Sequence, residues 1–191
     1  ARAWRRPNWR EVVAEGPFTL ADLEVAGSRL VVHAVERGVS RLSVYDLEGT
    51  ALREIALPGP GSVRDLAGRP DSGVFYALQE SFFQPTALYR CSSEASATSV
   101  VEALRSAADL SNFEFQRETF LARDGTAVGV MLAFKKGLRK DRNAPTIVLA
   151  SGGLLPLPAP FYAPHLLAWF EKGGLLAVPL IMWITHGHAE H

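Results

Sequence analysis

The sequence predicts β-propeller blades followed by an α/β region, and three observations lead to this expectation. Short apolar strands repeat across residues 18–104, where residues 28–36 resemble residues 72–80. An Asp-Gly turn signal at Asp124 then separates two further apolar strands. Finally, residues 146–180 read as strand, helix and strand, which is the pattern of a βαβ unit with a parallel strand pair.

The repeat in the first half has the spacing of propeller blades. Its two copies begin 44 residues apart, at positions 28 and 72. A period of about 40–45 residues built from four short strands is typical of propeller blades. The pairs Ala26-Gly27, Arg37-Gly38 and Glu48-Gly49 are suited to the hairpin connections. Two blades cannot close a propeller, so we expect either further blades or exposed sheet edges that pair with a partner.

His33 falls within this strand pattern. Leu30, Val32 and Ala34 alternate with Val31, His33 and Val35, so His33 belongs to the second face of a strand. We therefore interpret it as a structural residue and not as a ligand.

The second half centres on the run Thr146–Ala150, which reads as a strand covered on both faces. Pro145 lacks an N–H group and suits the first position of that strand. Gly152-Gly153 let the backbone turn and approach a ligand, and ligands of α/β sheets collect at the carboxyl ends of strands. Pro164 suits the start of a helix at 165–172, and a final strand is expected at 175–180.

Composition excludes several classes of function. Lys plus Arg and Asp plus Glu both number 20, so the net charge is zero and favours neither nucleic acid nor an anionic membrane as a partner. Cys91 is the single cysteine, which excludes an internal disulfide and a cysteine zinc site. The apolar stretch 175–184 is too short to cross a bilayer. We expect no cofactor, and a cytoplasmic location with the periplasm as the alternative.

The last residues contain four groups that can bind metals: His186, His188, Glu190 and His191. Their spacing is not that of a helical His-Glu-x-x-His site, and a catalytic metal needs a rigid second shell of partners. We therefore expect no metal site here. A metal-dependent hydrolase that uses these histidines is a third hypothesis.

Several motifs together resemble the prolyl oligopeptidase family of serine peptidases. In the β half they are Tyr45–Gly49, Ile55–Pro58 and Ser81–Pro85. In the second half they are Arg123–Thr126, Phe134–Leu138 and Trp169–Gly174, and the resemblance covers residues 8–178. The resemblance implies the end of a β-propeller in residues 1–112, with about two blades in 18–104. It also implies the N-terminal part of an α/β-hydrolase domain in residues 113–191.

The resemblance further implies a substrate class and a site. Members of this family cut short peptides after proline with a Ser-Asp-His triad. Ser151, Gly152 and Gly153 match the family's oxyanion loop, where Ser151 replaces a tyrosine, and Leu154 replaces a phenylalanine beside the proline pocket. The sequence contains no Gly-x-Ser-x-Gly nucleophile elbow, so no catalytic triad can be assigned. After Val178 the sequence departs from the family pattern.

The sequence therefore predicts a fragment of a prolyl endopeptidase that is inactive alone. Its expected partners are short proline-containing peptides and the missing remainder of the propeller and the catalytic domain. The alternative is a non-catalytic binding or scaffold module, because open blade edges favour strand pairing with another chain.

Overall fold

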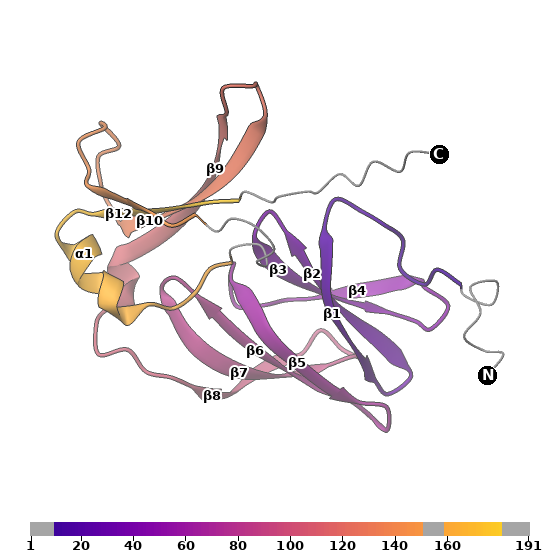
Figure 1. Ribbon diagram of the computed structural model, residues 1–191. Coiled ribbons are helices and arrows are strands. Elements are labelled where there is room, and N and C mark those ends of the chain that lie inside the picture. The colour runs from indigo at the N-terminus through magenta and orange to yellow at the C-terminus, as the bar shows by residue number, and fades with distance from the viewer. Residues whose placement is uncertain (1–9, 151–158, 181–191) are drawn as a thin grey trace. The chain divides into compact units, whose positions relative to one another are not determined.

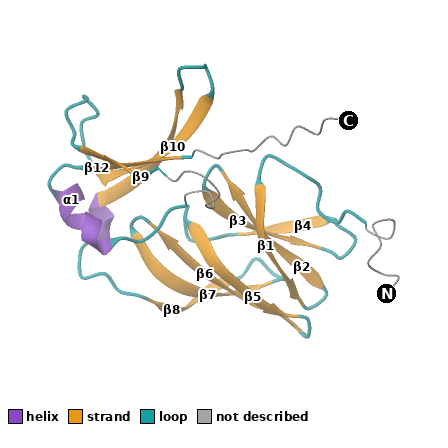
Figure 2. Ribbon diagram, in the orientation of Figure 1, coloured by secondary structure: helices purple, strands orange, loops and turns teal. Residues whose placement is uncertain are grey.

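The computed structural model describes residues 10–150 and 159–180 (Figure 1). The chain divides into two compact units. The first comprises residues 1–79 and 87–103, and the second comprises residues 80–86 and 104–191. Most of the described chain is strand, and α1 (Leu167–Glu171) is the α-helix within this part (Figure 2).

The first sheet is a four-stranded antiparallel meander. Its strands lie in the order β1 (Thr19–Ala26), β2 (Arg29–Glu36), β3 (Val39–Tyr45) and β4 (Ala51–Ile55). The turn between β2 and β3 has positive φ at both central residues, 50° at Arg37 and 77° at Gly38. This is the type I′ geometry that matches the twist of a hairpin, as the Arg-Gly pair predicts.

The second sheet repeats this arrangement. Its strands lie in the order β5 (Ser62–Arg69), β6 (Ser72–Ser81), β7 (Gln84–Ser92) and β8 (Thr98–Ala103). The two aligned segments of the sequence repeat therefore form the second strand of each sheet, β2 and β6. The predicted succession of four-stranded sheets is confirmed.

One apolar core joins these two sheets within the first unit. Val31 and Val44 contribute to it from the first sheet, and Phe75 and Tyr89 contribute from the second. Val31, Val44 and Phe75 are 0% exposed, so their side chains are completely removed from water. Burial of apolar area is the main driving force for folding, and here it holds sheet against sheet.

The second unit contains one mixed sheet. Its strands lie in the order β11 (Thr146–Val148), β12 (Leu175–Pro179), β10 (Ala127–Lys135) and β9 (Phe113–Leu121). β10 pairs antiparallel with both β9 and β12, whereas β11 pairs parallel with β12. The described part of this unit also contains the 3₁₀ turns η2 (Leu110–Asn112) and η3 (Pro164–Leu166).

The predicted turn at Asp124-Gly125 connects β9 to β10. The N–H of Ala122 donates to the carbonyl of Thr126 at 2.8 Å, and Gly125 has φ +84°. The carboxylate of Asp124 accepts from the N–H of Thr126 at 2.9 Å. The bond from Thr126 lowers the pKa of the Asp124 carboxyl group because it favours the charged form. The Asp-Gly prediction is confirmed.

The expectation that the central strand is covered on both faces is wrong. Ile147, Val148 and Leu149 are 38%, 64% and 45% exposed. The strand lies at one end of the sheet order and pairs with β12 alone, and no described element covers its faces. The run is apolar enough for a covered strand, but burial depends on neighbouring elements that the strand's own sequence does not specify.

The helix predicted at 165–172 is present but shorter, because its first turn is the 3₁₀ turn η3 and α1 spans only Leu167–Glu171. Pro164 occupies the first turn of η3, which leads into α1. Gly173 adopts φ +81°, a conformation that ends a helix readily when the residue is glycine. Phe170 of α1 is 2% exposed and packs with Met131 of β10 and Leu176 of β12. The helix is thereby fixed against this sheet.

Candidate functional site

The candidate site is the loop that follows β11 in the second unit. β11 and β12 run parallel, so their carboxyl ends lie at the same edge of the sheet. The N–H of Leu149 donates to the carbonyl of Ala177 at 2.9 Å, which ties the chain to β12 just before the loop. In α/β sheets this edge is where ligands bind.

The four residues predicted for this loop, Ser151, Gly152, Gly153 and Leu154, lie outside the described residues. Their assignment to an oxyanion loop and a proline pocket therefore stays a prediction. The structure describes the chain that enters the loop and the chain that leaves it.

The chain that leaves the loop is held by aromatic packing. The Phe161 ring lies 5.6 Å from the Phe82 ring, with an angle of 64° between their planes. Pro160 and Ala163 beside it are buried. Aromatic rings attract one another in this edge-to-face arrangement because the positive edge of one meets the negative face of the other. Both flanks of the loop, Leu149 and Phe161, are thus anchored within the second unit.

Two lysines of the charged segment 135–143 are paired with other residues of the second unit. The Nζ atom of Lys140 lies 2.6 Å from Oε1 of Gln116, bonds the carboxylate of Glu118, and lies 5.1 Å from the centre of the Phe134 ring. Lys135 pairs with Glu171 of α1. Because these two cations are already paired, their contacts are those of a charged surface loop and not of an anion site.

His33 is buried in the first unit, as a structural histidine would be. It is 6% exposed, and its Nε2 atom lies 2.8 Å from Oγ of Ser40. The same Oγ accepts from the N–H of Val63 at 2.8 Å. Burial lowers the pKa of His33, and the nearby Asp22 carboxylate partly opposes this effect. The imidazole is therefore neutral near pH 7 and contributes to the packing of the two sheets.

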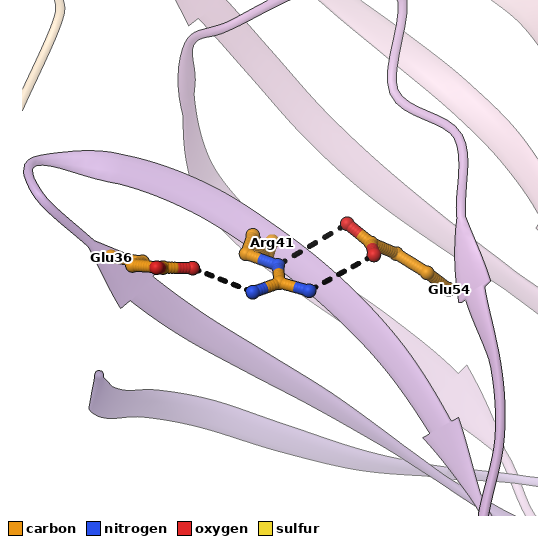
Figure 3. A network of polar contacts seen from close by, with 3 residues as sticks. All are labelled: Glu36, Arg41 and Glu54. Carbon is orange, nitrogen blue, oxygen red and sulfur yellow. Dashed lines mark hydrogen bonds and ion pairs between the residues drawn. The ribbon is translucent and has the colours of Figure 1, made fainter. Parts of the chain in front are cut away.

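Two carboxylates of the first sheet share one arginine (Figure 3). Arg41 binds Glu54 through two bonds, from Nε to Oε1 at 3.2 Å and from Nη2 to Oε2 at 3.0 Å, and it binds Glu36 through Nη1 at 2.5 Å. These partners raise the pKa of Arg41 further above its normal high value. Because Arg41 of β3 donates to Glu36 of β2 and to Glu54 of β4, the cluster links three strands, and its carboxylates are bound to a cation and not to each other.

A hollow of about 600 Å³ lies on the second sheet of the first unit. Arg69, Asp71, Tyr76 and Arg90 line it and are exposed, and Arg69 forms an ion pair with Asp71 at 2.5 Å. Ligand sites usually combine apolar walls with a few converging polar groups. This open, charged lining does not match that description.

Within residues 10–150 and 159–180, no cluster of three or more potential metal ligands occurs. The same residues contain no helix long and apolar enough to cross a membrane. The terminal histidine group, His186, His188, Glu190 and His191, lies outside the described residues.

Comparison with known proteins gives one family match. The model of the family "Prolyl oligopeptidase, N-terminal beta-propeller domain" matches residues 2–103, which include both sheets of the first unit. A prolyl endopeptidase of Elizabethkingia miricola is 27% identical over 173 residues, which cover 91% of this chain and 24% of that protein. The chain thus spans about a quarter of the length of the curated relatives that it matches.

Solved structures agree with this fold. One, from a study of two prolyl endopeptidases and their inter-domain dynamics, is 25% identical with a TM-score of 0.86, over 92% of this chain and 26% of that one. Prolyl oligopeptidase B from Galerina marginata, bound to a 25mer macrocyclization substrate, has a TM-score of 0.82 at 22% identity. That match covers 90% of this chain and 25% of the other chain.

Proposed function

The chain belongs to the prolyl oligopeptidase family, and from this premise we propose that it is part of a serine peptidase that hydrolyses short peptides after proline. In this proposal residues 1–112 are the end of the propeller and residues 113–191 are the start of an α/β-hydrolase domain. The reaction passes through an acyl-enzyme, with a serine nucleophile, a histidine base and an aspartate that orients the histidine.

One observation carries the proposal: the order of the elements on either side of residues 151–158. In the second unit β11 is the third strand along the chain, after β9 and β10, and η3 and α1 are the next described elements. In α/β-hydrolases the loop between the third strand and the first helix supplies an N–H group to the oxyanion hole. Ser151, Gly152 and Gly153 occupy this loop in the sequence, and Leu154 follows as a contact of the substrate proline.

No Gly-x-Ser-x-Gly is present among the 191 residues, so no nucleophile can be assigned, and without it neither a base nor an acid can be assigned. The chain alone is therefore inactive in this proposal, and its contribution is to shape and hold the oxyanion loop.

Cys91 is a free, buried cysteine, and burial raises the pKa of its thiol. The proposed compartment is the cytoplasm, with the periplasm as the alternative.

The test is intact-mass spectrometry of the protein from its source, before and after treatment with a fluorophosphonate label. The expected result is a species larger than 20.8 kDa that takes up one label, cleaves a succinyl-Gly-Pro chromogenic substrate before labelling, and no longer cleaves it afterwards. An unlabelled species of 20.8 kDa that leaves the substrate intact would overturn the peptidase proposal.

The role of Ser151 can be tested in the unlabelled, full-length enzyme. A serine hydroxyl reaches less far than the tyrosine hydroxyl that the family has at this position, so Ser151→Ala should change kcat little. Ser151→Tyr should restore a donor to the oxyanion hole, and one such donor changes kcat by about 10²–10³-fold. Equal kcat values for the three proteins would contradict the assignment of Ser151 to the oxyanion loop.

The second candidate function is a binding module that pairs through an open sheet edge. β8 favours it, because Val100 and Val101 are 58% and 50% exposed on a strand at the end of its sheet. An exposed apolar edge strand offers both backbone hydrogen bonds and side-chain contacts to a partner strand. The mass experiment separates the two candidates, because an unlabelled 20.8 kDa protein is the result that the binding module requires.

A further inference from the structure

The tip of the hairpin formed by β6 and β7 departs from ordinary turn chemistry. Phe82 and Phe83 alone lie between Ser81, the last residue of β6, and Gln84, the first of β7. Two-residue hairpin turns favour glycine, asparagine or aspartate at positive φ. The non-glycine residues with positive φ in the described chain are Arg37 and Arg142, so neither phenylalanine adopts that geometry. Local turn preference does not explain this tip.

Aromatic packing within the second unit does explain it. The Phe82 ring lies 5.4 Å from the Phe115 ring and 5.6 Å from the Phe161 ring, both edge to face. The Phe83 ring stacks on the Phe113 ring at 5.1 Å with 17° between the planes, and its edge meets Phe170 at 5.2 Å. All four distances fall in the range of roughly 4.5–7 Å where aromatic pairs attract.

The hairpin is divided between the two units. Residues 80–86 group with the second unit, whereas the rest of β6 and β7 groups with the first. The side chain of Gln79 donates to the carbonyl of Gly59 at 2.9 Å, a contact inside the first unit. The Oγ1 atom of Thr86 donates to Oε2 of Glu80 at 2.9 Å, a contact inside the second. The change of unit thus occurs at residues 79–80 and 86–87.

We propose that Phe82 and Phe83 form an anchor that completes the core of the second unit and opens together with it. The chain then passes between the units at three places, at 79–80, at 86–87 and at 103–104. This inference does not depend on the peptidase proposal.

Two described segments of the second unit depend on the anchor. Phe161 follows the loop that begins after β11, and Phe170 lies in α1. Both rings contact the tip, so loss of the tip should loosen the exit of the loop and the helix. The strands β2 and β3 of the first unit should remain as well ordered as in the wild type.

Native-state hydrogen exchange of the intact chain, read by mass spectrometry, tests the anchor. In the wild type, amides of residues 80–86 should share the opening free energy of β9 and β10, whereas residues 74–78 should follow the first unit. Phe83→Ala should speed exchange in β9, β10 and α1 about tenfold or more, because it removes a ring from a packed core. Exchange in β2 and β3 should stay within about twofold of wild type.

Two further variants keep the result clear. Phe83→Leu keeps most of the apolar volume and should give a smaller acceleration in the same segments, even if Phe83→Ala unfolds the second unit. Phe120→Ala is the matched control, because Phe120 is a phenylalanine of β9 that is 45% exposed, and it should leave exchange near wild type. Equal acceleration of both units, or acceleration confined to β5–β8, would overturn the anchor.

Discussion

The Nε2 atom of His33 lies 2.8 Å from Oγ of Ser40, and that Oγ also accepts from the N–H of Val63. The backbone N–H of Ser40 meanwhile donates to the carbonyl of Gly61 at 2.9 Å. Ser40 and His33 belong to the first sheet, whereas Val63 belongs to β5 of the second. One buried serine therefore links the two sheets of the first unit through polar contacts in addition to their common apolar core.

The buried His33 predicts a loss of stability in mild acid. Its pKa is lowered in the folded protein, so the unfolded chain binds more protons as the pH falls below about 6.5. The contribution of His33 to the free energy of unfolding should thus be constant above that pH and should decrease as the pH falls toward the lowered pKa. The slope should not exceed about 1.4 kcal/mol per pH unit for this single group.

Urea unfolding between pH 5 and pH 7.5 measures this slope, with far-UV circular dichroism as the signal. His33→Gln should reduce the slope, because glutamine does not titrate. Asp22→Asn should steepen it, because the Asp22 carboxylate raises the pKa of His33 and its removal lets burial act alone. Identical slopes in wild type and His33→Gln would show that other groups cause the acid sensitivity.

Replacing the linking serine should cost more than an ordinary surface change. Ser40→Ala removes the acceptor of the Val63 N–H and the partner of His33 Nε2, both in a buried setting. An unsatisfied buried polar group costs about 1–3 kcal/mol, so we expect a loss of about 2 kcal/mol or more. Ser43→Ala, on the same strand, is the control. A loss below about 0.5 kcal/mol for Ser40→Ala would mean that water replaces the hydroxyl.

The Arg41 cluster predicts a smaller and salt-dependent effect, although its contacts are short. The side chains of Arg41 and Glu54 are 45% and 54% exposed, so water and ions screen their attraction. Arg41→Ala should therefore lower the free energy of unfolding by at most about 1 kcal/mol, and 0.5 M salt should reduce that difference. Arg41→Lys should behave similarly, because lysine cannot form the two-bond contact with Glu54. A salt-independent loss above about 2 kcal/mol would contradict this estimate.

The strand pattern and the turns could be predicted from the sequence because both are local. The 44-residue repeat placed β2 and β6 correctly, and the Asp124-Gly125 pair marked the turn between β9 and β10. Each copy of the repeat, at residues 28–36 and 72–80, and the Asp-Gly pair lies within a short run of neighbouring residues. The preference of glycine for turns and the alternation of apolar side chains along strands are sufficient to predict these elements.

Burial and the division into units could not be predicted in the same way. The run Thr146–Ala150 has the composition of a covered strand, yet Val148 is 64% exposed, because coverage depends on elements elsewhere in the chain. Phe82 and Phe83 stand out in the sequence only as part of a family motif. The packing of Phe83 on Phe113 and Phe170 joins residues about 30 and 90 positions apart, and no local pattern encodes such a contact.

The close approach of the chain to Gly49 gives the last prediction. Gly49 has φ +99°, and a Cβ atom added there would lie 2.2 Å from the carbonyl oxygen of Val12. Gly49→Ala must therefore strain the backbone and displace the segment that carries Val12, at an expected cost of about 2 kcal/mol or more. Gly59→Ala is the matched control, since a Cβ atom at Gly59 would meet nothing within 4 Å. It should change the free energy of unfolding by less than about 1 kcal/mol in either direction. Urea unfolding of both variants measures the contrast. Similar stabilities for the two would show that residues near Val12 move away from Gly49 at little cost.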